Sequence, residues 1–246
     1  MIRALVIAAA LGSFAGAGRA VDCAPVTFQD VRYTVCEVDA SAEMIELFLY
    51  DETGAPLGQF SAVDRKLATQ KQKLTFAMNA GMYHDNRAPV GHYVEDGKEI
   101  MRVIDSAGPG NFGLLPNGVF CLRENRADVF ETSAFLAQAP ACRDATQSGP
   151  MLVIDGALHP RFLEDGTSKY IRNGVGTSPD GQRVVFAISD EPVNFHSFGT
   201  LFRDHLKLPN ALYFDGKVSR LYAPSVGRSD FGFNLGPIVG VVSPDN

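Results

Sequence analysis

Short apolar runs rich in β-branched and aromatic residues recur along the chain and predict a protein built mainly from strands. Each run is only a few residues long, which is the usual length of a strand rather than of a helix. The predicted strands are Val31–Val38, Ile45–Tyr50, Leu74–Met78, Gly118–Leu122, Met151–Ile154, Arg183–Ile188, Ala211–Phe214, Val218–Tyr222 and Ile238–Val242.

Asp-Gly pairs lie between many of these runs, and each pair can supply the tight turn of a β-hairpin. Pro179-Asp180-Gly181 is the clearest example, because it separates the apolar segments Ile171–Gly176 and Arg183–Ile188. The other pairs begin at Asp96, Asp155, Asp165 and Asp215. Recurrent hairpin turns favour antiparallel pairing of the strands.

Helical periodicity is confined to a few places. Phe198, Leu201, Phe202 and Leu206 have helical spacing, and Ser197 is positioned to cap that helix. Ala62–Lys71 and Ser133–Ala139 are two further candidates. We therefore predict an α+β fold with a mostly antiparallel or mixed β-sheet core and a few helices. No long polar linker or repeat divides the chain, so we expect a single domain over residues 26–246.

The first twenty residues have the pattern of an export signal. Arg3 precedes the apolar run Ala4–Leu11, and small residues follow as far as Ala20. A membrane anchor is the alternative, but the run is well short of the roughly 20 apolar residues that a span needs. We expect cleavage after Ala17 or Ala20, and a periplasmic or secreted protein without a stable membrane anchor.

Charge narrows the range of partners. The chain of 246 residues has 22 Lys and Arg against 28 Asp and Glu, for a net charge of −6. The basic residues are scattered and form no run, so we expect no nucleic-acid partner. A single well-placed arginine can still bind a phosphate group, whatever the net charge. We expect a monomer.

The four cysteines are expected to form disulfides, because the count is even and an exported protein enters an oxidising compartment. Of the three possible pairings, we favour the local one, Cys23 with Cys36 and Cys121 with Cys142. Zinc is the alternative, but no Cys-x-x-Cys or histidine-rich spacing supports it. A catalytic thiol is not expected.

Common catalytic motifs are missing from the sequence. Residues 108–113 match G-x-G-x-x-G, but a turn follows where the dinucleotide fingerprint requires a helix, so this segment is interpreted as a loop. His84, Asp85 and His92 could form half of a metal site, but no third ligand is implied. Loop or surface positions are expected for these histidines.

Four segments place polar, turn-forming residues next to apolar strands, where active sites are commonly built. They contain Asn79 with Gly81, Gln147 with Ser148, Arg172 with Asn173, and Asp215 with Ser219 and Arg220. Each also has a structural interpretation, because asparagine and glycine make turns, single arginines form surface ion pairs, and Asp-Gly is an ordinary hairpin turn.

In order and spacing, the four segments together resemble the phosphodiester glycosidase family, which includes the lysosomal enzyme that uncovers mannose 6-phosphate. The matching residues are Asn79-Ala80-Gly81-Met82-Tyr83, Ser148-Gly149-Pro150, Arg172-Asn173-Gly174-Val175-Gly176 and Asp215-Gly216-Lys217-Val218-Ser219. The stretch from Asn111-Phe112 through Pro116-Asn117-Gly118-Val119-Phe120 is similar to a compact, exported bacterial branch. The resemblance covers about residues 76–222.

Two departures from the family pattern are visible. Asn-Ala-Gly at residues 79–81 replaces Asn-Gly-Gly, and Lys217-Val218 replaces glycines after the aspartate. Side chains at 217 and 218 would stand where the family brings its backbone close to the ligand. The pocket is therefore either reshaped for a different substrate or no longer active.

The resemblance implies hydrolysis of a sugar-1-phosphodiester in envelope or extracellular glycans. Asp215 would act as base or nucleophile, Asp190 as a second carboxylate, and Arg172 as a phosphate clamp, with help from Arg220 or Lys217. The residues expected to position sugar or phosphate are Asn79, Gly81, Asn117, Gln147, Ser148, Asn173, Ser219 and Arg220. The sequence implies no particular cofactor, and it leaves open whether a divalent cation such as Ca²⁺, bound by loop aspartates, is needed.

Two other functions remain open at this point. The first is a non-catalytic module that binds a glycan or exopolysaccharide, in which Lys217-Val218 marks a decayed catalytic loop. The second is a phosphodiesterase that cleaves the P–O bond, which would normally need a metal cluster. Convergence of Asp215 and Arg172 on one pocket would favour the glycosidase over the binding module.

Overall fold

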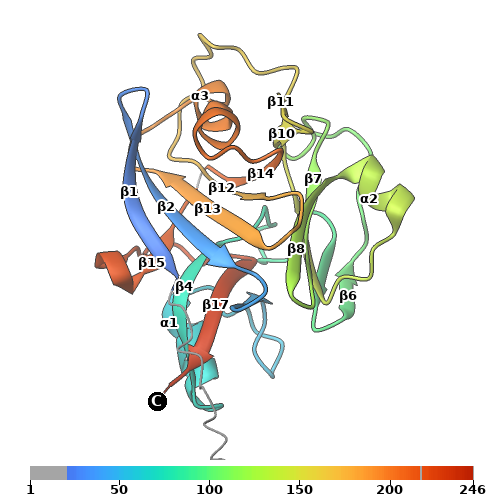
Figure 1. Ribbon diagram of the computed structural model, residues 1–246. Coiled ribbons are helices and arrows are strands. Elements are labelled where there is room, and N and C mark those ends of the chain that lie inside the picture. Colours follow the sequence, from blue (N-terminus) through green and yellow to red (C-terminus); the bar gives the residue numbers. More distant parts are fainter. Residues whose placement is uncertain (1–20, 217, 246) are drawn as a thin grey trace, which may run out of the picture.

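Three antiparallel β-sheets form the frame of the protein, and two of them contain strands from distant parts of the sequence (Figure 1). The computed structural model describes residues 21–216 and 218–245, so the predicted export signal and Lys217 lie outside the described residues. All strand pairs in these ranges are antiparallel. The predicted α+β fold with an antiparallel core and few helices is confirmed.

The largest sheet has seven strands in the order β1-β2-β13-β12-β14-β10-β11. Its central strands β13, β12 and β14 are buried almost throughout, because both faces of this sheet are covered. The strands are β1 Asp22–Phe28, β2 Val31–Asp39, β13 Arg183–Ser189, β12 Asn173–Thr177, β14 Asn210–Asp215, β10 Met151–Ile154 and β11 Ala157–Leu158.

The other two sheets have five strands each, in the orders β16-β15-β4-β17-β3 and β6-β5-β9-β7-β8. The first contains β16 Arg228–Ser229, β15 Leu221–Ala223, β4 Gln72–Asn79, β17 Ile238–Pro244 and β3 Met44–Phe48. The second contains β6 Lys98–Met101, β5 Tyr93–Glu95, β9 Asp144–Ser148, β7 Gly118–Arg123 and β8 Arg126–Glu131. Several of these strands escaped prediction because they are short or carry many polar residues.

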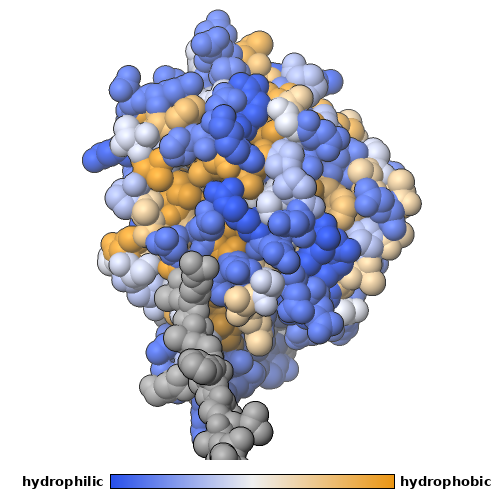
Figure 2. Space-filling view, viewed as in Figure 1, coloured by the Kyte–Doolittle hydropathy of each residue, from blue (hydrophilic) through white to orange (hydrophobic). Residues whose placement is uncertain are grey.

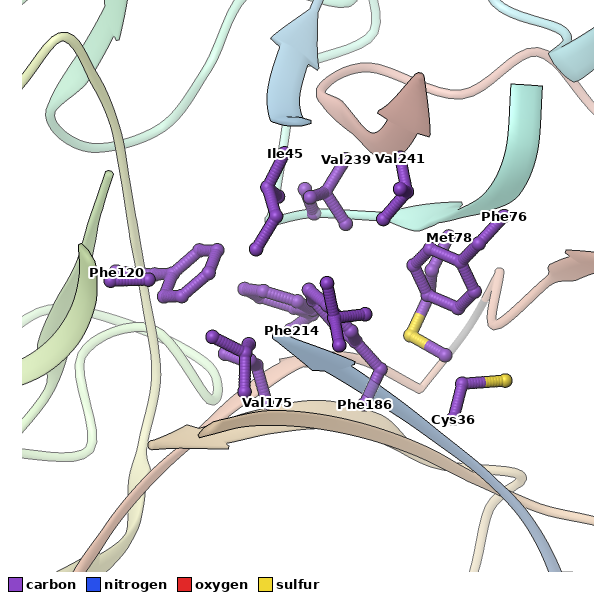
Figure 3. Packing of buried hydrophobic residues seen from close by; sticks show 14 of the residues in the cluster. Cys36, Ile45, Phe76, Met78, Phe120, Val175, Phe186, Phe214, Val239 and Val241 are labelled. Carbon is purple, nitrogen blue, oxygen red and sulfur yellow. The ribbon is translucent and has the colours of Figure 1, made fainter. Parts of the chain in front are cut away.

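The inner faces of all three sheets meet in one apolar core (Figure 3). Phe186 of the seven-stranded sheet packs on Phe76 of the second sheet, with ring centroids 4.7 Å apart. It also meets Phe120 of the third sheet edge-on at 5.9 Å. Because successive side chains on a strand alternate between faces, Val185 and Ala187, on either side of Phe186, belong to a different cluster on the outer face.

Each sheet has its outer face covered by one helix. Helix α1 (Phe60–Ala68) covers the second sheet and α2 (Thr132–Gln138) covers the third. Helix α3 (Phe195–Thr200) covers the seven-stranded sheet and continues into a π-helical turn, η1 (Leu201–His205). A short 3₁₀ turn, η2 (Pro224–Val226), follows β15. The face of the molecule shown in Figure 2 is largely hydrophilic, with apolar side chains in scattered groups.

The predicted cap of the third helix was wrong. The helix begins at Phe195, and the side-chain oxygen of Asn194 accepts a hydrogen bond from the Ser197 backbone N–H at 2.8 Å. Asparagine caps helices as well as serine does, so the first turn begins earlier than the apolar spacing indicated. The helix also widens into η1, where the Leu206 N–H donates to the Leu201 carbonyl at 2.9 Å.

Three of the predicted Asp-Gly hairpin turns are present, and two are not. The pairs at Asp96, Asp155 and Asp180 join β5 to β6, β10 to β11, and β12 to β13. Asp165 lies in a long connection without strands on both sides. At Asp215 the chain leaves the seven-stranded sheet and enters the second sheet, where β15 pairs with β4. The predicted strand 218–222 was therefore wrong in its start and in the expected hairpin pairing.

Both predicted disulfides are confirmed. Cys23 and Cys36 face each other across β1 and β2, and Cys121 of β7 is joined to Cys142 just before β9. Among the described residues, no helix has the length and apolar character needed to cross a membrane. The two disulfides are compatible with a secreted or periplasmic protein.

A group of acidic side chains is partly buried where the second and third sheets meet. The Tyr93 hydroxyl donates a hydrogen bond to Glu95 at 2.9 Å. Burial raises the pKa of Glu95 to about 7; the Tyr93 hydrogen bond and Lys66 oppose this rise, and the negative charges of Asp96 and Asp144 add to it. A proton is thus retained on Glu95 in the folded state at pH values where the unfolded chain has lost it.

This proton makes stability depend on pH. The Glu95 pKa is higher in the folded chain than in the unfolded chain, so the free energy of unfolding should fall as pH rises from about 4.5 to 7. Glu95→Gln remains neutral and can still accept the Tyr93 hydrogen bond. We expect this variant to exceed the wild type by about 1–2 kcal/mol at pH 8 and to match it at pH 4.

Urea unfolding at pH 4, 6 and 8 measures this difference. The control is Glu124→Gln, at an exposed turn position. Identical pH profiles for Glu95→Gln and the wild type would contradict a raised pKa at Glu95.

Candidate active site

The four polar segments singled out in the sequence meet where β4 of the second sheet approaches β12 and β14 of the first. Asn79 is the last residue of β4, and Asn173 is the first of β12. The Asn173 side-chain amide donates to the backbone carbonyl and to the side-chain oxygen of Asn79, both at 3.0 Å. The Asn79 amide donates back to the Asn173 side-chain oxygen at 3.3 Å. This amide pair, which is fully buried, joins the two sheets.

The same amide pair holds the chain segment that follows Asp215. The Asn173 side-chain oxygen accepts hydrogen bonds from the Asp215 N–H at 3.1 Å and from the Ser219 hydroxyl at 3.3 Å. The Asn79 side-chain oxygen accepts from the Arg220 N–H at 2.9 Å. The hydrogen bonds of these side chains are thus made within the protein, where Asn79, Asn173 and Ser219 position Asp215.

Ser148 and Gly81 also serve the fold of this region. The Ser148 hydroxyl donates to the Phe214 carbonyl at 2.8 Å, next to Asp215 in the chain. A Cβ atom at Gly81 would lie 3.0 Å from the Thr146 hydroxyl, so glycine allows β4 and β9 to approach closely here. Both residues therefore lie near the amide pair, and both stabilise the chain around Asp215.

Asp215 borders a pocket of about 300 Å³. Its carboxylate lies beside Gly216, where no larger residue fits, because a Cβ atom there would be 2.2 Å from the Tyr213 hydroxyl oxygen. The walls come from four stretches of chain far apart in sequence. The lining residues are Met82, Gly110, Asn111, Ser168, Tyr170, Tyr213, Asp215 and Gly216.

Arg172 lies directly behind the wall of this pocket and is completely buried. Its guanidinium stacks on Phe195 at 3.6 Å from the ring centroid, with the Tyr213 and Tyr170 rings at 5.3 and 5.6 Å. Nε donates to the Val193 carbonyl at 2.8 Å, and one terminal nitrogen donates to the Ser168 carbonyl at 2.9 Å. Burial lowers the pKa of Arg172, but a guanidinium stays protonated in proteins.

No carboxylate in the described part of the chain forms an ion pair with Arg172. Its other terminal nitrogen, Nη1, and the Tyr213 hydroxyl have no well-formed hydrogen bond to any residue in ranges 21–216 and 218–245. Burial raises the pKa of Tyr213 well above its ordinary value, so this hydroxyl keeps its proton and can donate. The pocket wall therefore offers a donor backed by a positive charge.

A stack of aromatic rings fixes Arg172 in this position. His159 stacks on Phe162 at 4.7 Å between ring centroids, and Phe162 stacks on Phe195 at 5.1 Å. Phe195 in turn meets Tyr213 edge-on at 4.8 Å. Sequence reasoning missed Tyr213, although a usable signal existed: on a strand, the residue two positions before Asp215 points to the same face.

Two charged residues predicted for the site lie elsewhere. Asp190 accepts hydrogen bonds from Arg228 at 2.7 Å and from the Thr34 hydroxyl at 3.2 Å, and it does not line the pocket with Asp215. The buried Arg220 guanidinium donates to the Gln59 side chain at 3.0 Å and to the Gly58 carbonyl at 3.3 Å. An apolar strand precedes Asp190 as well as Asp215, so the local sequence could not show that only Asp215 lies at the pocket.

Gln147 and Asn117 are buried and bonded within the protein. The Gln147 side-chain oxygen accepts from the N–H groups of His92 and Ile104, each at 3.0 Å. Asn117 accepts from the Thr132 hydroxyl at 2.6 Å and donates to the Phe112 carbonyl at 3.1 Å. These two side chains hold the loops before β7 rather than a ligand, so their predicted contact with sugar or phosphate does not fit the structure.

Metal ligands do not cluster in the described residues: no group of three or more histidine, cysteine, aspartate or glutamate side chains is arranged to hold an ion. The three residues suggested as half of a metal site have different environments. His92 is buried, with Nδ1 2.9 Å from the Met101 carbonyl, whereas His84 and Asp85 are exposed.

Comparison with known proteins connects this arrangement to a family. Residues 72–232 match the model of the phosphodiester glycosidase family, and this range includes all four polar segments. The uncharacterised protein YigE of Escherichia coli K12 is 32% identical over 185 residues, which are 75% of this chain and 72% of YigE.

Solved structures with a similar fold include the catalytic domain of zebrafish N-acetylglucosamine-1-phosphodiester alpha-N-acetylglucosaminidase. It has a TM-score of 0.62 and 14% identity, over 90% of this chain and 81% of that domain. A hypothetical protein from Synechocystis has a TM-score of 0.60 and 11% identity, over 90% of this chain and 61% of that one. An exported protein from Burkholderia pseudomallei has a TM-score of 0.52 and 12% identity, over 86% of this chain and 74% of that one. At these identities the likeness concerns the fold.

The charge behind the pocket predicts anion binding. Inorganic phosphate should raise the thermal unfolding temperature by several degrees at concentrations far above its dissociation constant, because it binds only the folded chain. Arg172→Met and Tyr213→Phe should each reduce this protection, and Arg203→Met, at a surface ion pair, should not. Differential scanning calorimetry at constant ionic strength measures the shift. Equal protection of all variants would place the phosphate elsewhere.

The amide pair predicts a large effect on stability. Asn173→Ala leaves the Asp215 N–H and the Asn79 amide without partners in a buried place, so we expect a loss of about 2–4 kcal/mol in the free energy of unfolding. Asn86→Ala, in an exposed turn, should change it by less than about 0.5 kcal/mol. Urea unfolding of both variants tests this, and similar losses would refute the role of the pair.

Proposed function

This chain belongs to the phosphodiester glycosidase family, and we propose that it is an exported hydrolase acting on a sugar-1-phosphodiester. It would cleave the bond between the anomeric carbon and the phosphodiester oxygen in envelope or extracellular glycans. The two disulfides support an oxidising compartment, and the signal-like pattern of residues 1–20 supports export.

The observation that carries the proposal is the buried guanidinium of Arg172 behind the Asp215 pocket. A buried charge is costly unless an opposite charge compensates it, and no described carboxylate pairs with this one. A phosphodiester in the pocket would bring the missing negative charge. Tyr213, which lines the pocket beside Arg172, would donate a hydrogen bond from its hydroxyl to a phosphate oxygen.

The proposed reaction needs few groups, because a phosphate ester is already a good leaving group. Asp215 attacks the anomeric carbon and forms a glycosyl ester that water then hydrolyses, or it removes a proton from a water molecule that attacks this carbon directly. The C–O bond breaks, and its electron pair stays on the phosphate oxygen. Arg172 and Tyr213 stabilise the negative charge that develops there. A poor leaving group would need a proton from a second carboxyl group acting as general acid. A phosphate ester does not, which agrees with the position of Asp190 outside the pocket.

Catalysis is favoured over simple glycan binding by the proximity of Asp215 and Arg172. Tyr170 and Tyr213 line the pocket together with Asp215, and the Arg172 guanidinium lies 5.6 and 5.3 Å from their ring centroids. A module that only binds neutral sugar rings would gain nothing from an unpaired buried cation. The cation costs stability, so it points to an anionic substrate.

The decisive test is turnover in ¹⁸O-labelled water. The oxidised protein lacking residues 1–20 is incubated with methyl phosphodiesters of glucose, mannose, galactose and N-acetylglucosamine 1-phosphates, and the products are analysed by mass spectrometry. We expect the label in the released sugar, which reports C–O cleavage. Label in the phosphate product would mean P–O cleavage and would overturn the glycosidase mechanism.

Two aspartate variants form a matched pair for this assay. Asp215→Asn should fold normally and lose at least about a thousandfold in kcat/KM, because amides neither attack carbon nor accept protons at neutral pH. Asp190→Asn, at the other strand end, should keep kcat/KM within about threefold, because it is bonded to Arg228 away from the pocket. Full activity of Asp215→Asn would remove this residue from the mechanism.

A further inference from the structure

Two phenylalanines stand almost entirely in solvent on a loop whose backbone is well held. Phe231 is 93% exposed and Phe233 is 83% exposed, more than any other large apolar residue described. The loop is fixed at one end by Asp230, which pairs with Arg228 at 3.1 Å, and at the other by the Leu235 N–H, which donates to the Gly58 carbonyl at 2.8 Å. Exposed aromatic side chains on a fixed loop commonly mark a binding surface.

Phe231 also borders a shallow hollow of about 190 Å³ between the loop and α1. Two further aromatic rings, Phe60 and Tyr222, line it with centroids 6.2 Å apart. Gln59, Asp64 and Asp230 add polar side chains around them. Aromatic faces combined with a few amide and carboxylate groups suit a pyranose ring, which has apolar C–H faces and a rim of hydroxyls.

The phenylalanine loop is separated from the Asp215 pocket by a single chain segment, Met82-Tyr83. Met82 lines that pocket, whereas the next residue, Tyr83, packs on the phenylalanine loop. The Tyr83 hydroxyl donates to the Asn234 carbonyl at 3.2 Å, and a Cβ atom at Gly236 would lie 2.5 Å from Tyr83. A glycan in the Asp215 pocket could therefore continue over Tyr83 to the loop.

Side-chain bonding links the two places as well. The Arg220 N–H is held by the Asn79 side chain, and the Arg220 guanidinium donates to Gln59, which lines the hollow. The Gln59 amide in turn donates to the Gly232 carbonyl, between the two phenylalanines, at 2.9 Å. The loop is thus anchored to the same network that positions Asp215.

We propose that loop 230–236 and the adjoining hollow form a second sugar-binding site, which takes an uncharged pyranose residue of the glycan whose phosphodiester enters the Asp215 pocket. The proposal rests on the proposed function and narrows its substrate to oligosaccharides or polysaccharides. The Asp64 carboxylate forms no ion pair with a described residue, so it disfavours an anionic lipid surface here, whereas a sugar hydroxyl can donate a hydrogen bond to it.

Binding can be measured without turnover, so that failure of this proposal is distinguishable from failure of the proposed hydrolysis. Asp215→Asn protein is titrated by isothermal calorimetry and saturation-transfer NMR with four neutral hexasaccharides: cellohexaose, maltohexaose, chitohexaose and isomaltohexaose. We expect saturable binding of at least one of them. Phe231→Ser combined with Phe233→Ser should weaken it about tenfold or more, because two stacking surfaces are removed.

The control is Leu136→Ser on α2, which removes another exposed apolar side chain but should leave binding unchanged. Thermal unfolding checks that the double variant is folded, as expected for substitutions at solvent-exposed positions. Absence of binding by all four sugars, or binding that the double substitution does not weaken, would overturn the proposal. The proposal would likewise be overturned if the double substitution abolished self-association or binding to phosphatidylglycerol vesicles while sugar binding was absent. That result would identify a second copy of the chain or a membrane as the occupant.

Discussion

The reciprocal amide pair of Asn79 and Asn173 is the contact on which the candidate site depends. It is the point where the end of β4 meets the start of β12, so it joins the first and second sheets beside their shared apolar core. Its oxygens also hold the N–H groups of Asp215 and Arg220, at either end of the crossing between the sheets. A buried amide pair with every group bonded is rigid, because any movement would leave a polar group unpaired.

The pocket has a buried positive charge, that of Arg172, beside it. Arg172 is stacked, buried and hydrogen-bonded on one side, yet its charge is not matched by a described carboxylate. The guanidinium is stabilised in part by the rings of Phe195, Tyr213 and Tyr170, whose centroids lie 3.6, 5.3 and 5.6 Å from it. Destabilising charges of this kind are typical of sites that bind an oppositely charged ligand, where stability is lower than it could be.

The architecture explains why such a site can exist in a small protein. Three sheets share one core, and each is covered on its outer face by one helix. This framework supports the connections between the sheets, and these connections carry polar side chains of the site. Asp215 lies on one such connection, and the loops that carry Asn111 and Ser168 complete the wall.

Local patterns in the sequence were sufficient for the longer apolar strands, the antiparallel class, the sequence-local disulfides and the four polar segments. These features depend on periodicity, turn residues and short separations, which a single sequence displays directly. Short or polar strands such as β6 and β16 were missed. The roles of the polar residues were decided only by the tertiary structure. Asn79 and Asn173 are 94 residues apart, and Gln147 and Asn117 are bonded to loops, so nothing nearby in sequence indicates that their hydrogen bonds are already satisfied. Asp215 and Asp190 differ only in which neighbours the packing of the sheets brings to them, and the same packing leaves the charge of Arg172 unmatched.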